Sequence, residues 1–160
     1  MSGESHFNQM LQVLQTVESL PEACQKALEM LAVEKVYDKN DYFATEGEYP
    51  TDLAFLCNGT FRAFYRSADG IQYNKTFFTD NTFMIALTAM ITGDKNLINI
   101  QALEKSTVLQ FNYLKFTRLF DEYHSLERLV RKVIEFEWAK AGAPPAALVP
   151  RLDHKKVKTQ

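Results

Sequence analysis

The stretch that decides the fold runs from Val33 to Phe78 and reads "VEKVYDKNDYFATEGEYPTDLAFLCNGTFRAFYRSADGIQYNKTFF". Its hydrophobic residues recur with a period near two, which is the side-chain period of a β-strand. Two turn signals, Asn58-Gly59 and Asp69-Gly70, divide the stretch, and each dipeptide supplies the positive φ angles that tight hairpin turns require. We therefore expect short antiparallel strands with a hairpin at each of these dipeptides.

Two further strands follow, over 98–103 ("INIQAL") and 107–113 ("TVLQFNY"). In the earlier stretch Phe61, Ala63 and Tyr65 alternate with Arg62 and Arg66, and Phe64 is the exception to that alternation. Many short strands with closely spaced turns are typical of a small antiparallel roll or barrel. The expected fold class is therefore mainly β, an antiparallel β-roll with α-helices on either side.

Helical periodicity marks both ends of this region. Apolar residues at helical spacing predict one helix from Phe7 to Val17 and a second one beginning near "SLPE", where Ser19 and Glu22 have the spacing of a capping box. Helices are also expected over 114–123 and 125–140. The longer of these two has an apolar stripe that could pack on the roll or on the same helix of a second chain, giving a homodimer. The stripe consists of Leu126, Leu129, Val130, Val133, Ile134 and Trp138.

The chain accordingly divides into N-terminal helices (1–32), a roll (33–114), C-terminal helices with the dimerisation stripe (115–140) and a tail (141–160). The tail is rich in proline and is expected to be disordered. It holds four basic residues against one acidic residue, a net charge of +3, which leaves −5 on the other 140 residues. A mildly acidic body is not a surface that collects phosphates.

Several classes of function are disfavoured by the sequence. The chain has no apolar run long enough to span a membrane, and its first ten residues lack the pattern of a signal peptide, so a cytoplasmic protein is expected. Cys24 and Cys57 are expected to be reduced and buried. His6, His124 and His154 lie outside the strand region, which argues against a metal site built on strands. No nucleophile motif or phosphate-binding glycine loop is present, so we expect no catalytic residue, no cofactor and no enzyme.

Two segments carry a resemblance to a known family. "YFATEGEYPTDLAFLCNGTFRAFY" resembles the early strands of the Crp/Fnr catabolite-activator family, and "NIQALEKSTVLQFNYLKFTRLF" is similar to the segment that follows its phosphate cassette. The resemblance covers about residues 7–140. It implies a jelly-roll or cupin-like roll of the cyclic-nucleotide-binding type, a ligand-sensing role in transcription regulation, and a small-molecule effector.

Members of that family usually continue into a helix-turn-helix module that reads DNA. The twenty residues after Lys140 are too few for one, so this chain alone is expected not to bind DNA. Two interpretations stay open here: a truncated regulator, or a free-standing effector-binding or interaction module. A third, a structural roll without a ligand, also stays open.

The cassette lies in "NTFMIALTAMITGDKNLINIQALEKS", residues 81–106. In family members that bind cyclic nucleotides it runs Gly-Glu, a short helix, then Arg and a small residue, and the glutamate and arginine hold the ribose and the phosphate. Counting back from Ala102–Glu104, Asn96 and Leu97 occupy the places of the arginine and its small neighbour, and the Gly-Glu pair falls near Met84-Ile85. High-affinity binding of cAMP or cGMP is therefore not expected.

Without these charged residues the cassette could form a pocket for an uncharged or apolar effector. Alternatively, the roll could fill this pocket with its own side chains. The candidate pocket residues are Met84, Ile85, Leu87, Thr88, Asn96, Leu97 and Asn99. Arg62, Arg66 and Lys75 on neighbouring strands could serve an anionic ligand, although charges that alternate along a strand more often face water.

Overall fold

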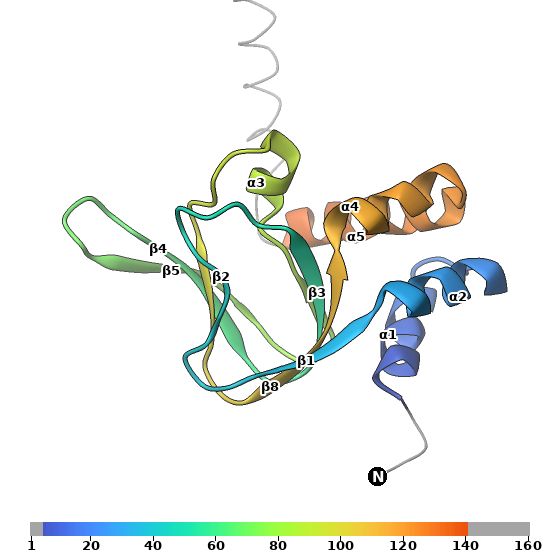
Figure 1. Cartoon of the computed structure of the whole chain (residues 1–160), viewed down its shortest axis with the longest axis horizontal. Helices are drawn as coiled ribbons and strands as arrows, with labels where there is room; N and C mark the ends of the chain where they lie inside the picture. Colours follow the sequence, from blue (N-terminus) through green and yellow to red (C-terminus); the bar gives the residue numbers. More distant parts are fainter. Residues whose placement is uncertain (1–4, 141–160) are drawn as a thin grey trace, which may run out of the picture.

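The structure is a computed structural model that describes residues 5–140 of the 160-residue chain. The tail predicted over 141–160, and the side chains of Lys75 and Trp138, lie outside the described part. Two helices come first, a roll of eight strands follows, and two α-helices joined by a 3₁₀ turn close the described chain (Figure 1). The N-terminal and C-terminal helices gather on one side of the roll, whereas the short helix between the sixth and seventh strands lies at its end, as Figure 1 shows.

The N-terminal helices are α1 (His6–Gln15) and α2 (Glu22–Leu31). Ser5 caps α1, because its Oγ accepts a hydrogen bond of 3.0 Å from the backbone N–H of Asn8. The predicted capping box at Ser19 is wrong. Helix α2 begins at Glu22, so Pro21 occupies the N-cap position, and no side chain there satisfies the free N–H groups of the first turn.

The strands form two antiparallel four-stranded sheets, which confirms the expected roll. The helix-facing sheet has the order β1 (Val33–Tyr37), β8 (Ser106–Asn112), β3 (Asp52–Asn58) and β6 (Thr82–Met84). The outer sheet has the order β2 (Tyr42–Ala44), β7 (Asn99–Ala102), β4 (Phe61–Arg66) and β5 (Gln72–Phe78). The short helix α3 (Leu87–Thr92) connects β6 to β7.

Strand β3 is buried on both faces, and its neighbouring residues belong to different hydrophobic cores. Leu53, Phe55 and Cys57 pack with the helices, whereas Ala54 and Leu56 pack inside the roll. Successive side chains of a strand point to opposite faces, so one strand divides the two cores. The helix-facing sheet is therefore the shared wall between the roll interior and the helices.

The two turn dipeptides have different outcomes. Asp69-Gly70 joins the paired strands β4 and β5, as predicted, and Gly70 has a φ of +86°. The hairpin predicted at Asn58-Gly59 is wrong, because β3 and β4 belong to different sheets and do not pair. Gly59 instead carries the chain across the roll at a φ of +128°, where a Cβ atom would collide with the side chain of Ser106.

Phe64, the exception to the alternation, lies on the outer face of the outer sheet. Phe61 and Ala63 pack inside the roll, so Phe64 points the other way, and it is still fully buried. The guanidinium carbon of Arg62 lies 3.9 Å from the centre of the Phe64 ring. Arg62 also donates to the side-chain oxygens of Gln72, Asn74 and Gln101. The sequence shows the broken alternation but not this arginine cover.

The last described segments are α4 (Tyr113–Arg118), the 3₁₀ turn η1 (Leu119–Asp121) and α5 (His124–Lys140). Helix α5 is joined to the turn after α1 by two ion pairs to Glu18, from Arg128 Nε at 2.8 Å and from Lys132 Nζ at 2.9 Å. Leu126 and Leu129 lie in the helix-side core. Figure 1 shows α5 running beside the N-terminal helices.

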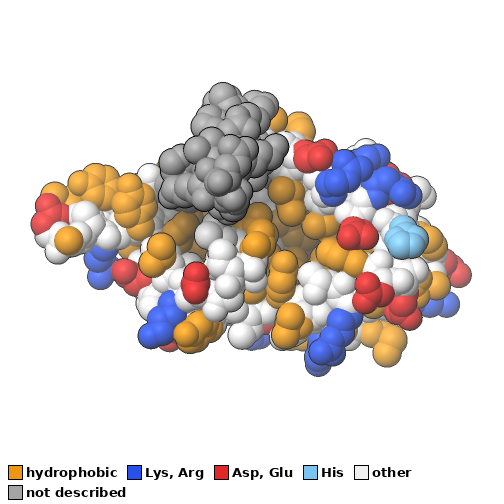
Figure 2. Space-filling model, turned by 90° about the horizontal axis from the view of Figure 1, so that it is seen from above, with side chains coloured by type: hydrophobic (Ala, Val, Ile, Leu, Met, Phe, Trp, Pro, Cys, Tyr) orange, Lys and Arg blue, Asp and Glu red, His pale blue; other side chains and the backbone are white. Residues whose placement is uncertain are grey.

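The hairpin of β4 and β5 projects from the roll on the side away from the helices (Figures 1 and 2). Tyr65, Ile71 and Tyr73 near its end are exposed, and the rings of Tyr65 and Tyr73 stack with their centres 5.4 Å apart. Within residues 5–140, the structure has no helix that is long and apolar enough to cross a membrane.

Candidate functional site

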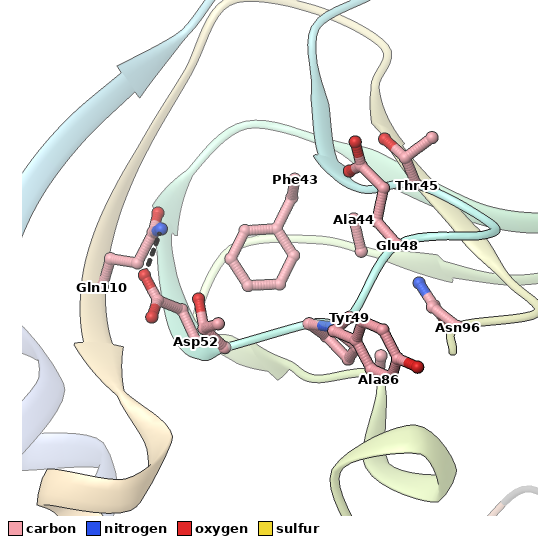
Figure 3. Close-up of a pocket in the computed structure, with 11 residues that line it drawn as sticks. Phe43, Ala44, Thr45, Glu48, Tyr49, Asp52, Ala86, Asn96 and Gln110 are labelled. Carbon is pink, nitrogen blue, oxygen red and sulfur yellow. Dashed lines mark hydrogen bonds between the residues drawn. The ribbon is translucent and has the colours of Figure 1, made fainter. Parts of the chain in front are cut away.

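A cavity of about 160 Å³ opens at the end of the roll next to α3 (Figure 3). Its wall comes from β2 and the loop that follows it, the first residue of β3, the residue before α3, the loop after α3, and β8. The lining residues are Phe43, Ala44, Thr45, Glu48, Tyr49, Pro50, Thr51, Asp52, Ala86, Asn96 and Gln110. Most of these side chains are polar, so the cavity is suited to a polar ligand rather than an apolar one.

One wall holds a chain of three hydrogen-bonded side chains. The hydroxyl of Tyr37 donates to Gln110 Oε1 at 2.7 Å, and Gln110 Nε2 donates to Asp52 Oδ2 at 2.8 Å. Gln110 is only 7% exposed, so both of its polar atoms need these partners. Burial raises the pKa of the Tyr37 hydroxyl, which keeps it a donor. These two hydrogen bonds fix the Asp52 carboxylate at the cavity wall.

The opposite wall carries Phe43, Glu48 and Tyr49. The Phe43 ring points into the cavity between Asp52 and Glu48 (Figure 3), and it meets the Tyr37 ring edge-on at 6.3 Å. Among residues 5–140 no hydrogen bond or ion pair engages the Glu48 carboxylate. The lining thus has two carboxylates, Glu48 and Asp52, and no lysine or arginine from the described residues.

The cassette loop is fastened to the loop after β2 through Asn96. Its backbone N–H donates to the Glu48 carbonyl at 2.8 Å, and its carbonyl accepts from the Gly47 N–H at 2.7 Å. The Asn96 side chain closes on its own loop, donating to the Ile98 carbonyl at 2.5 Å and accepting from the Ile98 N–H at 3.1 Å. The Asn96 side chain, which stands where the family's arginine is expected, is therefore already engaged by hydrogen bonds within its own loop.

Asn99 makes a second connection between the same loops. Its Oδ1 accepts from the backbone N–H of Glu46 at 2.9 Å, and its Nδ2 donates to Glu46 Oε1 at 3.1 Å. Asn99 is buried, and both ends of its amide are satisfied by one residue. Asn96 and Asn99 thus connect the two loops that border the open end of the roll.

Of the seven candidate pocket residues, the structure places Asn96 in the cavity wall. Met84 is fully buried inside the roll, Ile85 packs against the helix-side core, and Leu87 is half-buried at the start of α3. Thr88 is exposed and Leu97 is 78% exposed. The structure thus does not gather the seven into one pocket, because strand alternation and the turns of α3 point them in different directions.

Sequence reasoning missed the residues that line the cavity, above all Phe43, Glu48, Asp52 and Gln110. The signal available was the acidic loop between β2 and β3 and the glutamine within the apolar run Val108–Phe111 of β8. A buried glutamine needs partners, and this one finds Asp52 across the sheet.

The predicted cationic candidates lie elsewhere. Arg62 covers Phe64 on the outer face, and Arg66 lies 6.0 Å from the centre of the same ring. Neither lines the cavity. The side chain of Lys75 lies outside the described part of the structure.

The residues of the predicted dimerisation stripe have different environments. Leu126 and Leu129 are buried in the helix-side core, and Val130 and Val133 pack partly against it. Ile134 is 41% exposed, whereas the side chain of Trp138 lies outside the description. The N-terminal half of the stripe therefore stabilises the chain itself, and Ile134 is the described member that a second chain could reach.

The two cysteine thiols are free and buried. Burial raises the pKa of both, and with a contribution from the nearby Glu34 charge it raises the pKa of Cys57 to about 11. A thiol with this pKa is protonated at neutral pH and is a poor nucleophile. Within residues 5–140 no group of three or more histidine, cysteine, aspartate or glutamate side chains could hold a metal ion.

The order of the strands, the cassette loop and the cavity beside it can be compared with known proteins. Residues 34–123 match the model of a family described as the cyclic nucleotide-binding domain. The chain belongs to this family. A search of curated proteins finds no match.

Solved structures share the fold of this cyclic-nucleotide-binding-type domain. The sensor domain of the transcriptional regulator DNR from Pseudomonas aeruginosa has a TM-score of 0.68 at 15% identity, covering 82% of this chain and 88% of that one. The Thermus thermophilus catabolite activator protein has a TM-score of 0.65 at 13% identity, covering 81% of this chain and 60% of that one.

A third structure is the regulatory subunit of a cAMP-independent protein kinase A from Trypanosoma cruzi bound to guanosine. Its TM-score is 0.63 at 17% identity, covering 86% of this chain and 52% of that one. The chain therefore spans about 60% of the Thermus protein and about half of the Trypanosoma protein. Identities this low establish the shared fold, and these similar proteins are regulators or their sensor domains rather than enzymes.

Proposed function

We propose that this domain senses a small polar effector that is not a cyclic nucleotide, as the sensor part of a cytoplasmic transcription regulator of the Crp/Fnr type. The observation that carries the proposal is the charge of the cavity. Its described lining contains two carboxylates and no cationic side chain, so a cyclic phosphate would meet repulsion where the family's arginine would attract it.

The size of this effect decides against cyclic nucleotides. Charge-assisted hydrogen bonds are worth roughly 1.5–3 kcal/mol each. The loss of two of them costs about 3–6 kcal/mol, which is roughly a hundred- to ten-thousand-fold in affinity. Asn96 cannot replace the arginine, because it has no charge and its amide is already bonded to Ile98. Lys95 is exposed on the loop beside it and is not part of the cavity lining.

Support for a sensing role comes from the similar proteins. DNR and the catabolite activator protein are transcription regulators, and the Trypanosoma subunit, described as cAMP-independent, is bound to a nucleoside without a phosphate. By analogy, a roll of this family can lose phosphate recognition and keep a ligand site. We further propose that the chain forms a homodimer through α5 and does not bind DNA by itself.

The test is isothermal titration calorimetry of the purified chain with cAMP and cGMP. We expect no saturable binding in the micromolar range. The positive control is the double variant Asn96→Arg/Leu97→Ala, which restores the cationic side chain and its small neighbour. It should bind cAMP roughly ten- to hundred-fold more tightly than the wild type. The single variant Leu97→Ala is the matched control and should show no gain. A micromolar dissociation constant for the wild type would refute the proposal.

A further inference from the structure

We infer that the cavity beside Phe43 binds a small aliphatic ammonium cation. The inference rests on the proposed function, because it names the effector class of the same cavity. Four features support it: the charge balance of the lining, the aromatic rings in the wall, the fixed position of one carboxylate, and the volume.

The charge balance comes first. Glu48 and Asp52 both line the cavity and lie on opposite sides of the Phe43 ring in Figure 3. The Asp52 carboxylate is half-buried and turned toward Gln110, the Glu48 side chain is exposed, and no lysine or arginine of the described chain lines the cavity. The four ion pairs among residues 5–140 include neither carboxylate. A ligand that places a positive charge between them gains attraction from both, whereas a neutral ligand gains hydrogen bonds alone and an anion is repelled.

Aromatic rings provide the second feature. Phe43 points into the cavity between the two carboxylates, and Tyr49 lies in the same wall (Figure 3). The face of an aromatic ring attracts a cation, and the attraction grows where water is excluded. Phe43 is half-buried whereas Tyr49 is 63% exposed, so Phe43 is the ring that contributes most. The combination of carboxylates and aromatic faces recognises an alkylammonium group, whose methylene groups pack on the rings.

The third feature is the support of Asp52. Its Oδ2 accepts from Gln110, which is itself held by the Tyr37 hydroxyl, so the carboxylate is positioned by two buried side chains before any ligand arrives. The entropy cost of ordering the Asp52 carboxylate is therefore met during folding and does not weaken ligand binding. Glu48 differs, because no residue of the described chain bonds its carboxylate, and it remains available to the ligand.

The volume sets the size of the ligand. A cavity of about 150 Å³ in another protein admits benzene, and this one has about 160 Å³. Butane-1,4-diamine has as many non-hydrogen atoms as benzene and carries an ammonium group at each end.

The probes are therefore butane-1,4-diamine and its neutral counterpart of equal length, butane-1,4-diol. Each is titrated into the isotopically labelled whole chain and followed by amide chemical shifts, at low salt because surface-exposed charges are screened. We expect the diamine to saturate with a submillimolar dissociation constant and to shift signals of residues 43–52. The diol should not saturate.

Two variants test the carboxylates. Asp52→Asn keeps an oxygen that accepts from Gln110, and Glu48→Gln leaves the backbone bond to Asn96 in place. Each should weaken diamine binding roughly ten- to hundred-fold. Glu29→Gln, which removes an equal charge from the exposed face of α2, should leave it unchanged.

Three results would overturn the inference: no binding of the diamine, equal binding of the diol, or binding that both cavity variants leave unchanged. A cAMP titration of the same sample separates this from the proposed function. Saturation by micromolar cAMP would remove the proposed function as well, whereas absence of both diamine and cAMP binding removes the amine alone.

Discussion

The side-chain amide of Asn99 bonds Glu46 twice: it accepts from the Glu46 backbone N–H at 2.9 Å and donates to the Glu46 carboxylate at 3.1 Å. One buried side chain thereby fixes the loop that carries part of the cavity wall. In the sequence this asparagine is one polar residue near a cassette. In the structure it holds together two segments that lie 53 positions apart.

Replacing Asn99 with alanine should therefore destabilise the chain. The change leaves the Glu46 N–H without its partner in a partly buried position, which costs about 1–3 kcal/mol. Urea unfolding followed by circular dichroism measures the loss. Asn8→Ala is the control, since Asn8 is exposed on α1 and its contact with Ser5 is made by the backbone. Equal stability of both variants would show that the Asn99 bonds contribute nothing.

Gly59 should tolerate alanine less well than Gly47 does. Both have a positive φ, but a Cβ atom at Gly59 collides with Ser106, whereas at Gly47 it meets open space. We expect Gly47→Ala to cost about 1–2 kcal/mol from the backbone alone. Gly59→Ala should cost roughly 1–3 kcal/mol more, because the crossing between sheets must shift. Thermal unfolding of both variants gives the comparison, and equal melting temperatures would contradict it.

The ion pairs of Glu18 predict an acid-sensitive attachment of α5. The hydrogen bonds from Lys132 and then Arg128 lower the pKa of the Glu18 carboxyl below its usual value near 4.5. A carboxyl whose pKa is lowered by folding stabilises the folded state at pH values above its unfolded pKa. This contribution is therefore present at neutral pH and is lost as the pH falls below about 4.5. Glu18→Gln should speed amide exchange in α5 at pH 7.

The control for this prediction is Glu29→Gln, which removes an exposed charge on α2 that takes part in none of the ion pairs among residues 5–140. Hydrogen exchange read by mass spectrometry should show faster exchange over 124–140 in Glu18→Gln and wild-type exchange in the control. If α5 exchanges at the same rate in all three proteins, the ion pairs do not attach it.

The Cys57 thiol predicts a loss of stability at alkaline pH. Its pKa is raised to about 11 in the folded chain, chiefly by burial, against about 8.5 for an exposed thiol. A raised pKa stabilises the folded state below the unfolded pKa, and this contribution is lost as the pH rises from about 8.5 to 11. The loss over this whole range is on the order of 3 kcal/mol, because each pKa unit is worth about 1.4 kcal/mol.

Urea unfolding at pH 7 and pH 10.5 tests this, with Cys57→Ala as the comparison. The variant starts less stable, because it loses buried contacts, but it should lose less stability between the two pH values than the wild type does. Parallel pH dependence in the two proteins would show that another group causes the alkaline loss. A thiol reagent should also react slowly with the folded wild type at pH 7.

Exposed Ile134 gives the sharpest test of the proposed dimer. Val130 and Val133 pack partly on the chain's own core, so charges there would disturb the fold as well as an interface. Ile134→Asp should instead yield a folded monomer in light scattering. Met30→Asp, an equally drastic change at an exposed position of α2, should keep the wild-type mass. A wild type that is already monomeric, or a dimeric Ile134→Asp variant, would exclude this interface.

The order of helices, strands and helices could be predicted because each segment has one dominant period. Phe7 to Leu14 and Leu126 to Leu129 follow the helical spacing, and β4 and β5 follow the strand spacing around Gly70. The pairing of the strands into sheets could not be predicted from the sequence. Asn58-Gly59 has the chemistry of a hairpin, but the choice of sheet for β3 and β4 is made by distant strands, and no local signal encodes it.

The cavity was harder to predict for the same reason. Met84 and Leu97 belong to the cassette in sequence, yet one fills the roll and the other faces solvent. The lining instead combines Phe43, Asp52 and Gln110 from three strands. Only the fold brings these together, although a glutamine flanked by Leu109 and Phe111 indicates a buried polar contact.

The alternation along β3 has a mechanical consequence. Ala54 and Leu56 pack in the core inside the roll, and their covalent neighbours Phe55 and Cys57 pack in the core beside the helices. A displacement of β3 moves both sets together, because the side chains of the two cores alternate along one covalent strand. A ligand that displaced β3 from inside the roll would therefore displace the residues that contact the helices as well. No intermediate element would be needed to transmit the change from the roll to the helices.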